Sequence, residues 1–71
     1  MSETGVEIIA NGEPRRVPEG STLSGFLTSL EIPDARVAVE HNGRVVSKDS
    51  FASVILSGGD RLEIVTLVGG G

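Results

Sequence analysis

The chain has 71 residues, a formal net charge of −4 and no cysteine. This length predicts a single domain over residues 1–71 and argues against a deep catalytic cleft. The absence of cysteine excludes disulfides and thiolate metal ligands, and the acidic balance argues against nucleic acid as a partner. No apolar run approaches the roughly 20 residues of a membrane span, so we expect a cytoplasmic protein with no membrane partner.

The first part of the chain predicts a β-hairpin. Residues 6–10 are rich in β-branched side chains, and Asn11-Gly12 follows them. Asn-Gly is the strongest two-residue hairpin signal, because both central residues of a type I′ turn need positive φ. The returning strand, residues 13–17, contains Pro14, which has no backbone donor. We therefore expect an edge strand or a bulge there.

The next segment predicts a helix of two to three turns. Ser21 and Thr22 are helix-capping residue types, and Pro33 disfavours helical geometry at Ile32 and is expected to end the element. Apolar residues recur at i, i+3, i+4 and i+7, which places them on one helix face: Leu23, Phe26, Leu27 and Leu30.

A second hairpin follows the helix. Residues 36–41 and 44–46 read as strands around another Asn-Gly pair, Asn42-Gly43. After them we expect a single capped turn that anchors Phe51 in the core. A short apolar segment, residues 54–56, and a turn at residues 57–60 lead into the last strand.

The last strand, residues 61–67, has two faces of different character. Period-two alternation places Leu62 and Ile64 on one face and Glu63, Val65 and Leu67 on the other. Because Glu63 belongs to the second face, we expect that face to be exposed. Val65 and Leu67, with Val68 beyond them, then form an apolar cluster suited to docking a partner. The alternative is that another strand or loop covers this face.

The order strand, strand, helix, strand, strand, strand predicts an α+β fold. It is the β-grasp architecture, in which a mixed sheet of four to five strands packs on one main helix. Residues 1–4 and the tail, residues 68–71, are expected to be flexible.

No constellation of catalytic side chains is evident, so we do not expect an enzyme. His41 is expected to be exposed beside its turn, and the acidic residues are expected to be solvated on turns and outer strand faces. Gly58-Gly59-Asp60 has no following helix or Lys-Ser/Thr, and is interpreted as a turn. The two Asn-Gly pairs are interpreted as turns alone, and no metal site is predicted.

The exception is the tail, Gly69-Gly70-Gly71. Three extended glycines reach about 10 Å and can enter a groove too narrow for side chains. A carboxylate at Gly71 is a poor electrophile, so acyl chemistry there requires a mixed anhydride with AMP, from which a sulfur nucleophile displaces the AMP. ATP and magnesium would be bound by a partner enzyme. The alternative is a frayed terminus without a role.

A set of segments in this order resembles the ThiS family of sulfur carrier proteins in thiamin biosynthesis, which is related to the MoaD carriers. The segments are Asn11-Gly12-Glu13, Val37–Gly43 with Val45-Val46, Gly59–Val65, and Val68–Gly71. The resemblance runs from about Val6 to Gly71.

The resemblance implies a ubiquitin-like fold and a chemistry for the tail. Gly71 would be adenylated by a ThiF-type adenylyltransferase and converted to a thiocarboxylate with sulfur from a sulfur-donating enzyme. The thiocarboxylate would then serve a ThiG-type thiazole synthase. Gly70 would be the required neighbour of Gly71, and Gly69 an extra glycine that some members share. The chain itself would bind no cofactor.

Three alternatives remain open at this point. Molybdopterin-type and other thiocarboxylate carriers share the fold and the tail, so the terminal glycines do not separate the pathways. A ubiquitin-like modifier would be joined to lysines through Gly71. A non-covalent β-grasp binding module would not need the tail at all.

Overall fold

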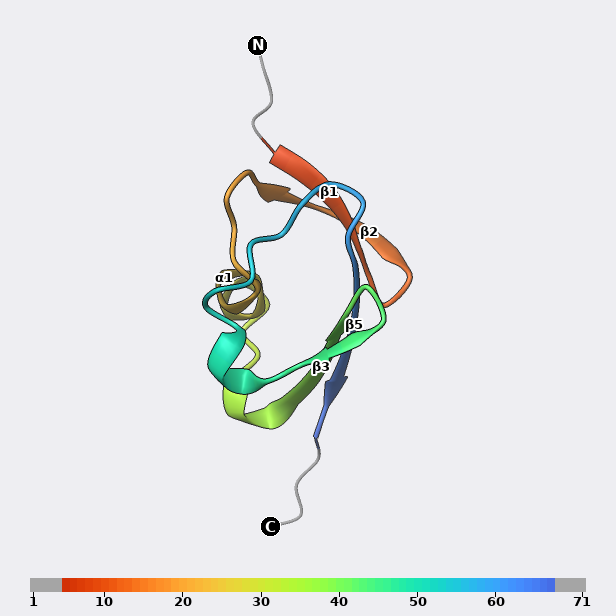
Figure 1. Ribbon diagram of the computed structural model, residues 1–71. Coiled ribbons are helices and arrows are strands. Elements are labelled where there is room, and N and C mark those ends of the chain that lie inside the picture. The colour runs from red at the N-terminus through yellow and green to blue at the C-terminus, as the bar shows by residue number, and fades with distance from the viewer. Residues whose placement is uncertain (1–4, 68–71) are drawn as a thin grey trace.

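The computed structural model describes residues 5–67, and of Asp34 the backbone alone. Within them, five strands form one mixed sheet, and a single α-helix packs on one face of it (Figure 1). The order across the sheet is β2-β1-β5-β3-β4, with β1 and β5 parallel and the other pairs antiparallel. This arrangement confirms the predicted β-grasp fold. The elements are β1 (Gly5–Ala10), β2 (Glu13–Pro18), α1 (Leu23–Ser29), β3 (Val37–His41), β4 (Arg44–Val46) and β5 (Arg61–Thr66).

The first hairpin forms because Asn11 and Gly12 take the positive φ values that a two-residue turn needs, 52° and 81°. β1 and β2 then pair without a bulge from Ala10↔Glu13 to Gly5↔Pro18. β2 lies at the edge of the sheet, where the missing donor of Pro14 costs least. Of the two expectations for this strand, the edge position is the correct one.

Helix α1 begins where the capping residues predicted it. Thr22 is the N-cap, and its Oγ1 accepts a hydrogen bond of 3.0 Å from the backbone nitrogen of Gly25. Of the predicted apolar stripe, Leu23, Phe26 and Leu27 are buried and Leu30 is partly buried.

The helix ends earlier than Pro33 suggested, and the prediction of the end point was wrong. Glu31 takes a left-handed conformation with φ of 62°. The backbone nitrogen of Ile32 then donates to the carbonyl of Leu27 at 3.0 Å, and that of Glu31 to the carbonyl of Thr28 at 2.9 Å. This pair of bonds is a Schellman motif, which usually has glycine at the left-handed position. The sequence did not predict this helix end, because the left-handed position is occupied by a glutamate and not by glycine.

The second half of the chain wraps around the helix and returns to the sheet. The second turn has φ values of 52° at Asn42 and 85° at Gly43, and it joins β3 to β4. A short 3₁₀ helix, Lys48–Ser50, then places Phe51 in the core as predicted, with 1% of its surface exposed. In the following apolar segment, Ile55 forms an isolated bridge with Thr22. Another 3₁₀ helix, Asp34–Arg36, precedes β3.

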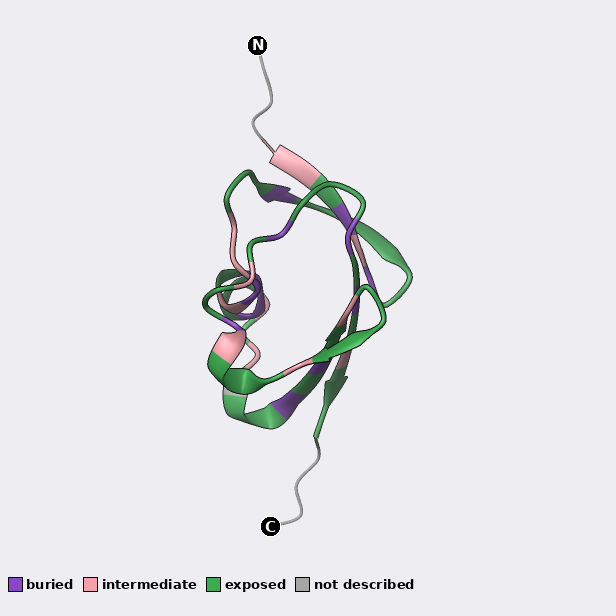
Figure 2. Ribbon diagram, in the orientation of Figure 1, coloured by how far each residue is buried: buried purple, intermediate pink, exposed green. Residues whose placement is uncertain are grey.

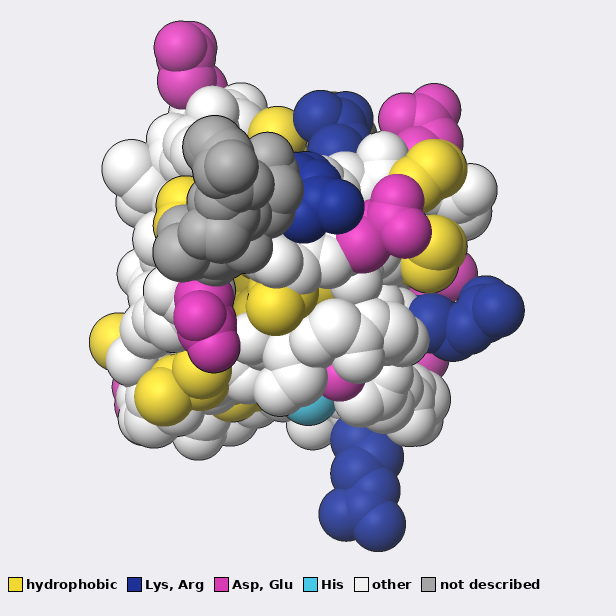
Figure 3. Space-filling view, turned by 90° about the horizontal axis from the view of Figure 1, so that it is seen from above, with side chains coloured by type: hydrophobic (Ala, Val, Ile, Leu, Met, Phe, Trp, Pro, Cys, Tyr) yellow, Lys and Arg dark blue, Asp and Glu magenta, His cyan; other side chains and the backbone are white. Residues whose placement is uncertain are grey.

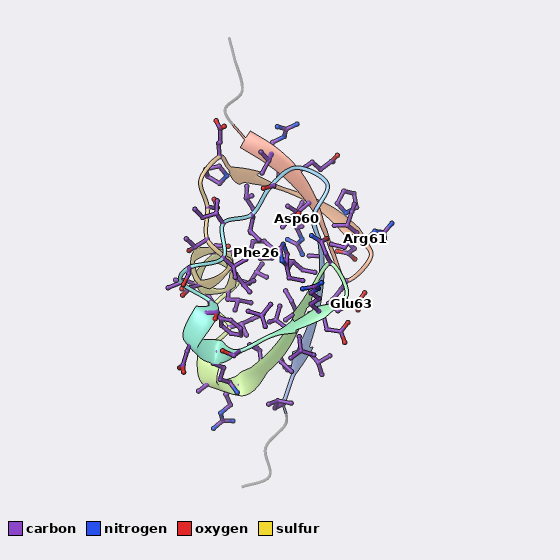
Figure 4. All side chains as sticks on the ribbon, viewed as in Figure 1. Phe26, Asp60, Arg61 and Glu63 are labelled. Atoms are coloured by element: carbon purple, nitrogen blue, oxygen red, sulfur yellow. The ribbon has the colours of Figure 1, made fainter. Side chains whose placement is uncertain are left out.

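The hydrophobic core lies between α1 and the sheet, as the burial colours show (Figure 2). Both aromatic residues of the chain are in it, and aliphatic side chains supply the remaining volume. Figure 4 shows Phe26 pointing from α1 toward the sheet. The buried hydrophobic residues are Ile8, Ala10, Val17, Leu23, Phe26, Leu27, Val37, Val39, Phe51, Leu56 and Leu62.

Candidate functional site

Strand β5 carries the chain from the core to the predicted tail. It lies in the middle of the sheet, between β1 and β3. The pairing with β3 continues one step past the strand, because the backbone nitrogen of Leu67 donates to the carbonyl of Arg36 at 2.7 Å. Backbone hydrogen bonds therefore hold the chain up to Leu67.

The two faces of β5 are those that the alternation predicted. Leu62 is 1% exposed and Ile64 is partly buried, whereas 57% of Val65 and 46% of Leu67 is accessible to solvent. Figure 4 shows Glu63 on the side of β5 that is turned away from α1. The expected exposure of this face is confirmed. Its role in docking a partner remains a prediction.

The remaining predicted site residues, Val68, Gly69, Gly70 and Gly71, lie outside the described residues, and so does the segment 1–4.

The exposed sheet face continues beyond β5, and Val45 in β4 is its most exposed large apolar residue, at 79%. We call this face, turned away from α1, the outer face. A shallow hollow of about 100 Å³ on it is lined by Ala38, Val39, Glu40, Val45, Glu63 and Val65. Sequence reasoning missed Val45, although the two-residue turn at Asn42-Gly43 already placed it opposite Glu40.

The side chain of Asn11 forms hydrogen bonds with β5 at a point where β1 no longer pairs with that strand. β1 pairs with β5 only at Ile9↔Arg61 and Ala10↔Leu62 before it turns away. Beyond that, Asn11 Oδ1 accepts from the backbone nitrogen of Ile64 at 2.7 Å, and Nδ2 donates to its carbonyl at 3.0 Å. The amide thus takes the place of the next residue of a neighbouring strand.

The second turn asparagine holds the beginning of the same strand. The backbone nitrogen of Arg61 donates to Oδ1 of Asn42 at 2.9 Å, and the backbone nitrogen of Asn42 donates to the carbonyl of Arg61 at 2.8 Å. The interpretation of the two Asn-Gly pairs as turns alone was therefore incomplete. Each asparagine also fixes a segment of β5.

Asp60, directly before β5, is buried, and its carboxylate is the centre of a polar cluster. Oδ2 accepts from the backbone nitrogen of Ser57 and from Nε2 of His41, both at 2.8 Å, and Oδ1 accepts from Nδ2 of Asn42 at 3.2 Å. Because a carboxylate only accepts, Nε2 of His41 carries the proton. The cluster joins the turn before β5 to the hairpin turn between β3 and β4.

The environment of Asp60 lowers its pKa. Burial alone would raise the pKa of this carboxyl, but the hydrogen bonds from His41, Ser57 and Asn42, with the charge interaction with His41, outweigh the desolvation. Asp60 is therefore ionised at neutral pH, and its ionised form stabilises the fold.

Two expectations about polar residues were wrong. His41 is partly buried rather than exposed, because its ring reaches Asp60. Asp60 is buried rather than solvated, because its hydrogen bonds replace the water that it loses. The sequence pattern around each residue does not predict this contact, since Asp60 and His41 are 19 residues apart.

A second hollow, among the residues that the structure describes, is lined by none of the predicted site residues. It measures about 290 Å³ and lies between the first hairpin, the segment after α1 and the end of β5. Its charged residues, Glu13 and Arg15, form an ion pair of 3.7 Å with each other, and both side chains are well exposed. We find no nucleophile with an adjacent base among its lining residues: Ala10, Asn11, Glu13, Arg15, Leu30, Ile32, Ile64 and Thr66.

Within residues 5–67, no group of three or more potential metal ligands comes together. The described part of the chain also contains no helix long and apolar enough to cross a membrane. Figure 3 shows that, at the end of the molecule seen from above, hydrophobic side chains lie in small groups among charged ones. Such a mixed surface is ordinary for a protein.

Comparisons with known proteins agree with one another. The model of the ThiS family matches residues 7–71. A crystal structure of the thiamine biosynthesis protein ThiS from Geobacter metallireducens is 30% identical, covers 93% of this chain and 100% of its own, and superimposes with a TM-score of 0.77. This level of agreement supports kinship as well as a common fold.

Two curated relatives differ in length. A thiazole synthase of Magnetococcus marinus is 41% identical over 66 residues, which are 93% of this chain. The chain spans only 20% of the length of that relative. "Uncharacterized protein ycf40" of Pyropia yezoensis is 37% identical over 71 residues, which are 100% of both chains.

Proposed function

The chain belongs to the ThiS family of sulfur carrier proteins, and we propose that Gly71 is the group that carries the sulfur. In this proposal Gly71 supplies a terminal carboxylate, which is adenylated and then converted to a thiocarboxylate. The thiocarboxylate donates its sulfur to thiazole formation in thiamin biosynthesis. The chain is then a protein cosubstrate of partner enzymes rather than an enzyme.

The chemistry needs groups that partner enzymes supply. A carboxylate oxygen of Gly71 attacks the α-phosphorus of ATP, and pyrophosphate leaves. Hydrosulfide released by the sulfur donor next attacks the acyl carbon: the carbon–sulfur bond forms, the bond from the acyl carbon to the phosphate oxygen breaks so that AMP leaves, and loss of the thiol proton gives the thiocarboxylate. A ThiF-type adenylyltransferase would bind ATP and magnesium for the first step, and a sulfur-donating enzyme would serve the second. Because ATP is a cytoplasmic metabolite, we place this chemistry in the cytoplasm.

The observation that carries the proposal is the geometry of β5. Hydrogen bonds fix the chain through Leu67, two residues before the first glycine of the predicted tail, Gly69. Val65 and Leu67 are exposed beside this exit point. A partner that binds these side chains therefore binds close to the glycines that must enter its active site, and binding at one point helps to offset the cost of ordering the tail.

The thiazole synthase relative supports the choice of pathway. In Magnetococcus marinus, a region like this chain makes up a fifth of a protein named thiazole synthase. Covalent linkage raises the effective concentration of a carrier at the enzyme that uses it. We therefore propose a ThiG-type thiazole synthase as the acceptor for the sulfur from Gly71.

Intact-mass measurement tests the proposal. After incubation with the activating enzyme, ATP and a sulfur source, the mass should show one oxygen replaced by sulfur at Gly71. A variant without Gly70 and Gly71 should remain unmodified while its circular dichroism spectrum stays that of the full chain.

An unchanged mass, under conditions that convert a known ThiS protein, would contradict the proposal. Isopeptide-linked conjugates in cell extracts would instead indicate a modifier. Full function of the shortened variant would indicate a binding module that does not use its tail.

A further inference from the structure

The outer face carries two glutamates directly opposite each other. In the antiparallel pairing of β3 with β5, Glu40 lies opposite Glu63, and Ala38 lies opposite Val65. On the other side of β3, Glu40 lies opposite Val45. One row across three strands is therefore Val45, Glu40, Glu63, and the neighbouring row contains Ala38 and Val65.

Within residues 5–67, the carboxylates of Glu40 and Glu63 have no ion-pair or hydrogen-bond partner. Arg61, two residues before Glu63 on the same face, forms no ion pair with it. Like charges directly opposite across two strands destabilise a sheet by up to about 1 kcal/mol. The free domain thus keeps an unfavourable pair on its surface.

The position of this pair limits what can cover the apolar residues. Glu40 separates Val45 from Glu63, and all three line the same shallow hollow with Val65. A surface that covers both valines must also remove water from both carboxylates. Burying an unpaired carboxylate costs far more than burying a valine contributes. The covering surface must therefore bring a positive charge.

We propose that the outer face docks on an apolar protein surface with one basic side chain, an arginine, that reaches between Glu40 and Glu63. A guanidinium is planar, has five donors and can bind two carboxylates at once. The inference rests on the proposed function, because the partner is the ATP-dependent activating enzyme. It extends the docking surface from Val65 and Leu67 across the sheet to Val45.

Other occupants do not fit these charges. In a symmetric contact between two copies of this face, the glutamate pair of each copy would meet that of the other. The phosphates of a nucleic acid or an anionic membrane would also meet both carboxylates. A wholly apolar partner would leave the carboxylates buried without a counter-charge.

The test removes the two charges without changing the shape. In the Glu40→Gln/Glu63→Gln variant, affinity for the purified activating enzyme should fall about tenfold or more, because the arginine loses both carboxylates. The dependence of the dissociation constant on salt should weaken as well. Thermal unfolding of the free variant should move to the same or a higher temperature, because the like-charge pair is gone. Glu19→Gln, at an exposed loop position, is the matched control and should alter affinity less than twofold.

Measurement of adenylation separates this inference from the proposed function. At limiting enzyme, the Glu19→Gln control should be adenylated as completely as the wild type, whereas the double glutamine variant should need more enzyme for the same yield. Wild-type affinity in the variant, with normal adenylation of both proteins, would overturn the inference alone. Absence of adenylation in the wild type would overturn the proposed function and, with it, the assignment of this partner.

Discussion

The side-chain amide of Asn11 binds both the nitrogen and the carbonyl oxygen of Ile64, at 2.7 and 3.0 Å. These residues are 53 positions apart. These hydrogen bonds lie just beyond the last paired residues of β1 and β5. They therefore stabilise the half of β5 that leads to the tail. A turn residue in the first hairpin therefore helps to position the last strand.

We predict that Asn11→Gly destabilises the domain by about 1–3 kcal/mol, the sum of two hydrogen bonds. Glycine takes the positive φ of this turn without strain, so the loss reports the amide and not the turn. Urea denaturation measures it. An unchanged midpoint would mean that water replaces the amide at Ile64 without cost.

We predict that Asp60 contributes to acid unfolding. Its folded pKa is lowered, so its ionised form stabilises the protein fully above the ordinary aspartate pKa of about 4. That contribution is lost as the pH falls through the folded pKa, and it is absent below. In Asp60→Asn, stability at neutral pH should be lower and this part of the pH dependence should vanish. Denaturation midpoints from pH 7 to pH 2 measure both effects, and Glu19→Gln should retain the wild-type pH profile.

We predict that Glu31→Gly stabilises the domain by about 1 kcal/mol. Glu31 has a φ of 62°, where residues with a Cβ pay roughly 1–2 kcal/mol and glycine does not. Glu31→Ala removes the same charge but keeps the Cβ, so it should give no comparable gain. Thermal unfolding of the two variants distinguishes relief of backbone strain from loss of the charge. An equal gain in both would contradict the strain argument.

We predict that Val65→Asp weakens binding to the activating enzyme by more than tenfold while the domain stays folded. More than half of Val65 is exposed, so the substitution should cost about 1 kcal/mol of stability or less. Leu62→Asp, on the buried face of the same strand, should unfold the domain because it buries an unpaired charge. Circular dichroism and calorimetric titration give the two readouts. Unfolding of the Val65 variant would mean that the outer face belongs to the core.

Much of the fold was predictable because its signals are local. Asn11-Gly12 and Asn42-Gly43 specify tight turns through their backbone angles, and these angles also set the register of both hairpins. Thr22 and the apolar stripe behind it specified the start and the buried face of α1. The end of α1 was not predictable, since glutamate is a rare choice for a left-handed helix end.

The candidate site was predictable only in part. Alternation along β5 separated Val65 and Leu67 from Leu62, because neighbouring side chains of a strand always point to opposite faces. The family resemblance assigned the role of Gly71, which lies outside the described residues. The place of Val45 on the outer face was missed, because the sequence of β4 does not indicate that β5 pairs with the other side of β3.

The sequence by itself determined the two hairpins, the capped helix and the division of the last strand into a buried and an exposed face. Each of these depends on backbone angles or periodicity within a few residues. Only the tertiary structure decided that β5 lies between β1 and β3. That placement brings Asn11 to Ile64, buries Asp60 beside His41 and sets Glu40 against Glu63. Such contacts arise from the packing of strands distant in the chain, so no local pattern of residues encodes them.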